Sequence, residues 1–148
     1  MRTMRHVIQK SKFLIFLGLL LLLSESLHAK LRFFPEDSVL LRSDVGEAKI
    51  TGFFIHNLSS DSLQIKGVKI EGPGAEYFHI DQNTCENESD FSLQENDICY
   101  VIIEFIPEAP SDGLEGFIAY LKVFYVSGQK AQLQQIMATL IGYAYSND

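Results

Sequence analysis

Apolar side chains recur at every second position through much of residues 31–144, and clusters of polar, turn-forming residues separate these stretches. A two-residue period is typical of β-strands, and the 3.6-residue period of an amphipathic helix is absent from this region. The pattern therefore predicts an all-β sandwich of about seven to nine strands. The expected strands are Leu31–Phe34, Val39–Arg42, Lys49–His56, Leu63–Ile70, Ile98–Ile106, Leu114–Val126 and Lys130–Tyr143.

Three positions add detail to this pattern. Pro35 ends the first strand, because proline cannot donate a hydrogen bond to a sheet. Gly67 interrupts the alternation of its strand, which indicates a β-bulge. The Ser127-Gly128 pair is typical of a tight turn and predicts that the last two strands form a β-hairpin.

The N-terminus has a different pattern. Residues 1–12 carry four basic side chains and no acid, residues 13–23 form an apolar run, and the small-residue segment SESLHA follows. This order predicts a secretory signal peptide at 1–29 and a single domain at 30–148, in a periplasmic or secreted protein. If cleavage follows Ala29, Leu27 occupies the −3 position, where a small residue is usual. Two alternatives therefore stay open: cleavage after Ser26, or retention of the segment as an anchor. No cysteine follows the run, which excludes a bacterial lipoprotein anchor.

The charge of the chain limits the classes of molecule that it is expected to bind. The 148 residues are 47% hydrophobic, as in a globular domain, and the formal net charge is −7. Residues 30–148 hold 8 basic and 18 acidic side chains, which gives −10 after cleavage. An acidic protein repels nucleic acid and anionic membrane surfaces. We therefore expect no nucleic-acid partner and no membrane insertion after signal cleavage.

The two cysteines, Cys85 and Cys99, both lie in the domain. An even cysteine count in an exported chain favours a disulfide. A metal pair or a catalytic thiol are the alternatives. The first needs more soft ligands than His56 and His79 supply, and the second needs a paired base that no local motif provides. We expect a structural disulfide that closes a loop of about 15 residues.

The order of motifs resembles ASH-type immunoglobulin-like domains, including the bacterial "choice-of-anchor D" domains, within the PapD-like and major-sperm-protein-like sandwiches. The matching segments are Val45-Gly46, ITGFFIHN ending at Asn57, SSDSLQIKGVKIEG, GAEYFHI, the two cysteines, CYVIIEFIP and TLIGYA. Where this family commonly has Pro-Gly before the second cysteine, this chain has Gln94–Asp97. The resemblance implies an immunoglobulin-like β-sandwich with a role in binding or assembly, and it transfers no catalytic residue.

Few residues suggest chemistry. The acidic stretch 81–97 offers oxygen ligands for Ca²⁺, but it lacks the EF-hand spacing, so we expect a solvated loop pinned by the disulfide, with a cation site as the alternative. His56 and His79 have no companions at metal-ligand spacing. No nucleophile elbow, P-loop or Rossmann glycine pattern occurs. We expect no cofactor, metal or catalytic residue. Asn57 and Asn87 begin glycosylation sequons.

Alternation also predicts which apolar side chains point outward. If Cys99, Val101, Ile103 and Phe105 face the core, then Tyr100 and Ile102 face away from it. The same argument turns Phe54 outward on its strand, and Ile118, Tyr120 and Phe124 outward on the long aromatic strand. Contiguous exposed apolar patches mark partner surfaces, unless loops or terminal segments cover them. These six residues are the predicted partner-face candidates.

These expectations favour a non-enzymatic interaction or assembly module of the bacterial envelope, for example an accessory subunit of a secretion or surface complex. Its partners would be other envelope proteins. The alternative is a periplasmic chaperone-like protein that donates an edge strand. Against it, PapD-type chaperones have two such domains and basic residues that grip a client carboxylate. A small metal-dependent enzyme is a third class, for which the sequence offers no site.

Overall fold

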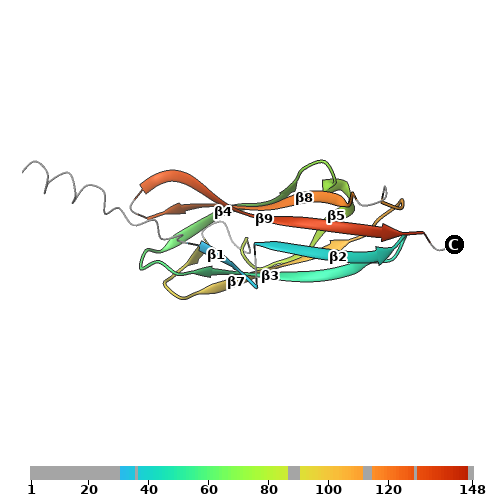
Figure 1. The fold of residues 1–148 in the computed structure, drawn as a ribbon. Helices are drawn as coiled ribbons and strands as arrows, with labels where there is room; N and C mark the ends of the chain where they lie inside the picture. The colour runs from blue at the N-terminus through green and yellow to red at the C-terminus, as the bar shows by residue number, and fades with distance from the viewer. Residues whose placement is uncertain (1–30, 36, 87–90, 112–114, 129, 147–148) are drawn as a thin grey trace, which may run out of the picture.

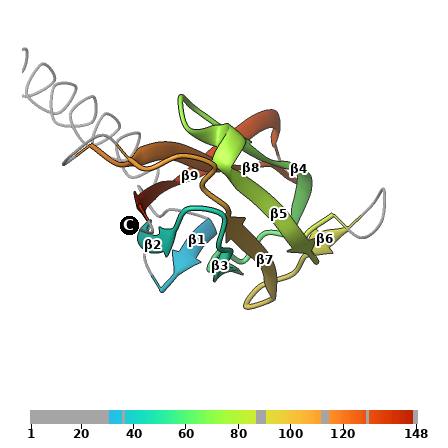
Figure 2. The same ribbon diagram turned by 90° about the vertical axis from the view of Figure 1, so that its right-hand side faces the viewer.

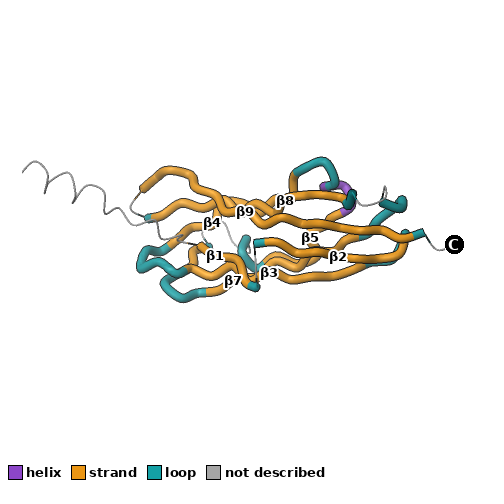
Figure 3. The backbone as a smooth tube through the Cα atoms, in the orientation of Figure 1, coloured by secondary structure: helices purple, strands orange, loops and turns teal. Residues whose placement is uncertain are grey.

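The computed structural model is an elongated sandwich of two β-sheets (Figures 1 and 2). Most of the described chain is strand, and its helical part is a single 3₁₀ turn at Ala75–Tyr77 (Figure 3). No helix of the described part is long and apolar enough to cross a membrane. The structure describes residues 31–35, 37–86, 91–111, 115–128 and 130–146. The predicted signal peptide at 1–29 lies outside these ranges.

The first sheet has four antiparallel strands in the order β1-β3-β7-β5. They are β1 (Leu31–Phe34), β3 (Lys49–Asn57), β7 (Ile98–Phe105) and β5 (Phe78–Asn83). Strand β3 lies at the centre, with β1 on one side and β7 on the other. Strand β3 therefore separates β1 from β7, which carries Cys99 of the disulfide.

The second sheet has five strands in the order β2-β9-β8-β4-β6. They are β2 (Ser38–Asp44), β9 (Lys130–Tyr145), β8 (Phe117–Ser127), β4 (Leu63–Glu71) and β6 (Ser92–Leu93). Strand β2 runs parallel to β9, and the other pairs are antiparallel. The chain therefore changes sheets between β1 and β2.

The predicted strands all form: Leu31–Phe34 has the predicted bounds, and no end of the others differs from the prediction by more than three residues. The bulge at Gly67 is confirmed, because the register between β4 and β8 shifts between Ile65 and Gly67. The β8–β9 hairpin is confirmed as well, with Ser127 opposite Lys130. The predicted start of the long aromatic strand at Leu114 lies outside the described residues.

The acidic stretch 81–97 differs from the expected loop. Its first residues belong to β5 and Ser92–Leu93 forms β6, so part of it is sheet edge. Both strands are edge strands, where polar side chains are tolerated because one side faces solvent. Their sequences therefore lack the apolar alternation of the central strands.

The core lies between the two sheets and follows the predicted inward residues. On β3, β7 and β8 these residues are all buried: Phe53, Ile55, Cys99, Val101, Ile103, Phe105, Leu121, Val123 and Tyr125. The ring of Phe105 packs against Phe78 and Phe117, with centroids 4.9 and 6.2 Å away. Because the core side of each strand is fixed by this packing, the outward side of each strand is fixed too.

Candidate functional site

Three aromatic side chains form a row across the outer surface of the β1-β3-β7-β5 sheet. The register places Phe34 beside Phe54, and Phe54 beside Tyr100. Their exposed fractions are 64%, 47% and 37%, whereas the preceding residues Phe33 and Phe53 are almost fully buried. Directly opposite side chains on neighbouring strands lie about 5 Å apart, so the three rings make one continuous strip.

Isoleucines extend this strip along the strands. Ile98 lies one outward position before Tyr100 on β7, and Ile102 lies one position after it. Ile50 points outward on β3 and, like Ile98, is more than half exposed. We call this surface the aromatic face; its members are Phe34, Ile50, Phe54, Ile98, Tyr100 and Ile102.

Charged and titratable side chains lie at the two ends of the aromatic face. At one end Arg32 is opposite His56, which is itself opposite Ile98. At the other end Glu104 lies between Ile50 and His79. The centre of the face carries no charge, so a partner can cover it without burying an unpaired ion.

The remaining predicted residues, Ile118, Tyr120 and Phe124, lie on the outer surface of the other sheet. There the Nζ of Lys69 is 5.9 Å from the centroid of the Phe124 ring. The Nζ of Lys122 lies 2.7 Å from a carboxylate oxygen of Glu71, and this hydrogen bond and charge hold the pKa of Glu71 below its usual value. Charged groups therefore lie beside Tyr120 and Phe124.

The six predicted partner-face residues thus belong to two opposite surfaces of the sandwich. Phe54, Tyr100 and Ile102 are brought together on the aromatic face, and the other three are not part of it. Three members were missing from the prediction: Phe34, Ile50 and Ile98. The alternation of β1, β3 and β7 already turns each of them outward. Their proximity to Phe54 and Tyr100, however, depends on the strand register.

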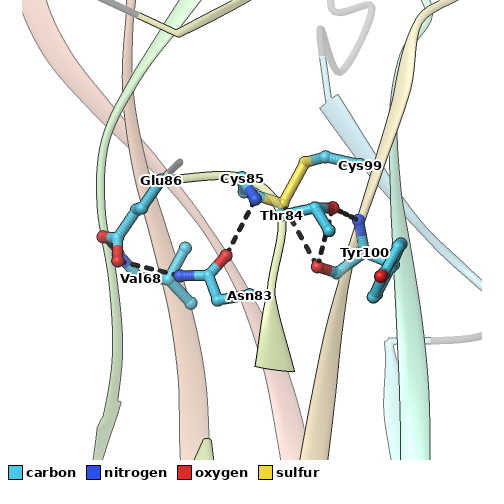
Figure 4. Close-up of a disulfide and its surroundings, with 7 residues drawn as sticks. All are labelled: Val68, Asn83, Thr84, Cys85, Glu86, Cys99 and Tyr100. Carbon is cyan, nitrogen blue, oxygen red and sulfur yellow. Dashed lines mark hydrogen bonds between the residues drawn. A yellow bond between two sulfur atoms is a disulfide. The ribbon is translucent and has the colours of Figure 1, made fainter. Parts of the chain in front are cut away.

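The disulfide holds the edge of the sheet next to Tyr100 (Figure 4). Cys85 and Cys99 are bonded, which confirms the predicted pairing, and both are buried. The backbone N–H of Thr84 donates to the carbonyl of Tyr100 at 2.9 Å, and the N–H of Tyr100 donates to Oγ1 of Thr84 at 2.9 Å. The covalent link and these hydrogen bonds fix the segment after β5 against β7, and so position the Tyr100 side chain.

We expect Cys99→Ser to lower the free energy of unfolding by about 2–5 kcal/mol. Without the bridge the loop between the two cysteines is open in the unfolded chain, which gains conformational entropy. Urea denaturation of the variant and the wild type measures the difference. Cys85→Ser/Cys99→Ser controls for reactions of the single free thiol. Equal midpoints, or alkylation of both thiols in the native protein, would contradict a structural role for the bridge.

Glu86, from the acidic stretch, links the two sheets beside the disulfide (Figure 4). Its carboxylate accepts a hydrogen bond from the backbone N–H of Val68 on β4, and another at 2.8 Å from the side chain of Asn83. The Oδ1 of Asn83 also accepts from the N–H of Cys85. Glu86 therefore supplies a hydrogen-bond acceptor for a backbone N–H of β4 next to the bulge, and its role is structural. Glu88 and Asp90 lie outside the described residues.

One side of β9 is a second possible contact surface. Strand β2 pairs with β9 only from Thr139 to Tyr145, and no described strand pairs with the same side of β9 before Thr139. Leu133 and Met137 on this stretch are about half exposed. An unpaired edge with apolar side chains is suited to pair with a strand of another protein.

The described residues contain no group of three or more His, Cys, Asp or Glu side chains that could hold a metal ion. His56 and His79 lie on β3 and β5 at opposite ends of the aromatic face. Two pockets of about 490 and 640 Å³ flank Tyr143 near the end of β9, and their linings are mainly apolar. We therefore take the aromatic face as the candidate surface for recognition.

No family model and no curated protein sequence matches this chain. Among solved structures it is similar to PapD-like domain 7 of human CEP192, with a TM-score of 0.56 and 12% identity over 80% of this chain and 87% of that one. It is also similar to the periplasmic chaperone SfaE, with a TM-score of 0.54 and 14% identity over 77% of this chain and 56% of that one.

A protease, VesB of Vibrio cholerae, contains a similar region, with a TM-score of 0.59 and 11% identity over 77% of this chain. The match spans 32% of VesB, so this chain corresponds to a part of that protein. These likenesses show the fold: the chain is a PapD-like β-sandwich, as the resemblance of its motifs implied.

Proposed function

We propose that this chain is a non-enzymatic protein–protein interaction or assembly module of the bacterial envelope. In this proposal residues 1–29 direct export and are removed, and residues 30–148 act in the periplasm or outside the cell. The Cys85–Cys99 disulfide supports an oxidising compartment. The accessory subunit of a secretion or surface complex is the role that we favour.

The observation that carries the proposal is the aromatic face. Soluble proteins rarely expose large contiguous apolar patches, and those that they expose are often partner sites. Five of its six members, all except Ile102, are large hydrophobic side chains classed as exposed. Burial of apolar surface contributes about 25 cal/mol per Å² before the costs of association, so a few of these side chains supply several kcal/mol.

The aromatic face suits a partner better than the opposite surface does. A protein that covered Tyr120 and Phe124 would also have to desolvate Lys69, Lys122 and Glu71, which costs free energy unless new partners replace water. On the aromatic face the charged residues lie at the ends, where a polar rim belongs in a protein interface. We therefore assign docking to the aromatic face.

Tyr100→Asp should strongly reduce co-purification with envelope proteins and leave the thermal melt close to that of the wild type. The new carboxylate is solvated in the free protein but unpaired at a contact. Tyr120→Asp is the matched control, because it adds the same charge on the opposite surface, and it should retain the partners. If Tyr120→Asp loses them and Tyr100→Asp keeps them, the docking surface is the other one.

A second candidate function is strand donation, as in a periplasmic chaperone, and the unpaired stretch of β9 favours it. Leu133→Asp places a charge on that stretch and leaves the aromatic face unchanged. If strand donation is the function, Leu133→Asp should abolish binding and Tyr100→Asp should not. The opposite result supports docking at the aromatic face.

A further inference from the structure

We propose that the partner at the aromatic face is a second copy of this chain, docked face to face across a two-fold axis. This inference rests on the proposed function, because it names the occupant of the same surface. An interface of this kind is isologous, so the surface must carry both halves of each complementary pair. The aromatic face meets this requirement in both shape and charge.

The shape requirement is met on β3. Phe54 projects outward, and two residues away Gly52 has no side chain. No atom lies within 4 Å of the position where a Cβ on Gly52 would be, so there is an open gap in the surface beside Ile102. A projecting ring and a gap therefore lie on either side of Phe53. An axis through this position sets the ring of each copy against the gap of the other.

The charged residues of the face are arranged about the same position, Phe53. Arg32 lies on one side of β3, opposite His56, which is three residues after Phe53. Glu104 lies on the other side of β3, opposite Ile50, which is three residues before Phe53. Phe53 is thus midway between Arg32 and Glu104. A two-fold axis that lies in the face, crosses β3 there and is perpendicular to the line from Arg32 to Glu104 brings each Arg32 over Glu104 of the second copy.

The distribution of charge also favours this surface for self-association. Two copies of an acidic chain repel each other, and residues 30–148, with 8 basic and 18 acidic side chains, carry a formal charge of −10. The outward residues of β1, β3 and β7 include one acid, Glu104, and one base, Arg32. Neither has an ion-pair partner among the described residues. Contact through this face therefore adds no net like-charge repulsion and gives both side chains a partner.

The size of the face sets the expected affinity. Its four outward rows span about 20 Å along the strands and its three strands about 10–15 Å across, at the usual spacings of a β-sheet. This footprint of about 200–300 Å² per copy is smaller than the roughly 600–1,000 Å² that each partner buries in a stable specific interface, so the self-association is weak. We expect a dimer that dissociates in the micromolar range.

The test is a charge exchange measured by sedimentation equilibrium, with the exported protein purified alone. The wild type should form dimers as its concentration rises through the micromolar range. Arg32→Glu and Glu104→Arg should each raise the dissociation constant at least tenfold, because each places like charges opposite each other. Arg32→Glu/Glu104→Arg should return it to within about threefold of the wild type. Thermal melts of all four proteins show whether each is folded.

The double variant gives the sharpest outcome, because its recovery requires Arg32 of one copy to meet Glu104 of another. A wild type that stays monomeric at several hundred micromolar would overturn the inference, as would folded single variants that dimerise normally. A monomeric wild type whose envelope partners are lost on Tyr100→Asp would leave the proposed function standing without the dimer. Phe54→Asp is a further variant that should abolish dimers without adding charge at either end.

Discussion

Replacing Asn57 with aspartate should lower the free energy of unfolding by about 4 kcal/mol, although the two side chains have nearly the same size. Asn57 is fully buried at the end of β3. Its Nδ2 donates to the carbonyls of Asp61, Leu93 and Gln94 at 2.8–3.0 Å. Its Oδ1 accepts from the N–H and the hydroxyl of Ser59 at 2.9 and 2.8 Å. One amide thus joins the end of β3 to two segments, the turn that holds Ser59 and Asp61 and the end of β6 at Leu93 and Gln94.

A carboxylate at this position cannot donate, so three carbonyls would lose their partner and face a buried negative charge. Asn96→Asp is the matched control, because Asn96 is exposed in a neighbouring turn and its side chain makes no hydrogen bond among the described residues. Chemical denaturation of both variants measures the difference. Equal losses from the two would contradict the role of the Asn57 amide. The same burial argues against glycosylation at the Asn57 sequon, and the Asn87 sequon lies outside the described residues.

Gly142→Ala should lower the free energy of unfolding by about 3 kcal/mol, because the added methyl group overlaps a core side chain. A Cβ on Gly142 would lie 2.3 Å from Cε2 of Phe105. The Phe105 ring is fully buried between the two sheets and has no room to move away. This contact explains why β9 carries a glycine in its TLIGYA segment.

Gly52→Ala is the control for this substitution, since a Cβ there would meet no atom within 4 Å. It should leave stability within about 0.5 kcal/mol of the wild type, as at most surface positions. Gly142→Ala/Phe105→Leu should cost less than the sum of the two single changes, because the smaller side chain gives the methyl group space. Strict additivity in thermal or urea unfolding would show that the two residues do not compete for space.

The sequence predicts the central strands well because one face of each strand is buried in the core and the other face is turned toward solvent. On β7, alternating residues Cys99, Val101, Ile103 and Phe105 are all buried, and the residues between them point outward, as alternation requires. A shift of one residue would expose the whole apolar set, so the pattern determines both the strand and its orientation. The disulfide was predictable for a separate reason, the even number of cysteines in a chain expected to be exported.

Two of the edge strands, β5 and β6, could not be predicted in the same way. β5 and β6 are short and polar, and they form because β7 and β4 offer backbone groups that need partners. The link from Glu86 to Val68 joins residues from two sheets and has no local signature. A period of two assigns a residue to a face of its strand, but not to a position beside residues of another strand.

The candidate site shows the same limit. Alternation placed Phe54, Tyr100 and Ile118 outward, and all three are at least 37% exposed. It could not show that Ile118 lies on the opposite sheet, because that depends on the order of strands in space. Nor could it show that Phe34 completes a row with Phe54 and Tyr100, since this requires the β1–β3–β7 register.

Coverage of the aromatic face by a partner protein in the envelope can be tested without adding charge to that face. A photo-crosslinking phenylalanine analogue can replace Tyr100 on the aromatic face or Tyr120 on the opposite surface. Both variants exchange one aromatic side chain for another, so both should fold and be exported normally.

Irradiation of intact cells followed by immunoblotting then reports which surface contacts a protein. We expect a discrete protein adduct from position 100 and none from position 120. An adduct of twice the chain's own mass would identify the second copy. Adducts from position 120 alone, or no adduct from position 100 in a well-exported protein, would contradict the claim.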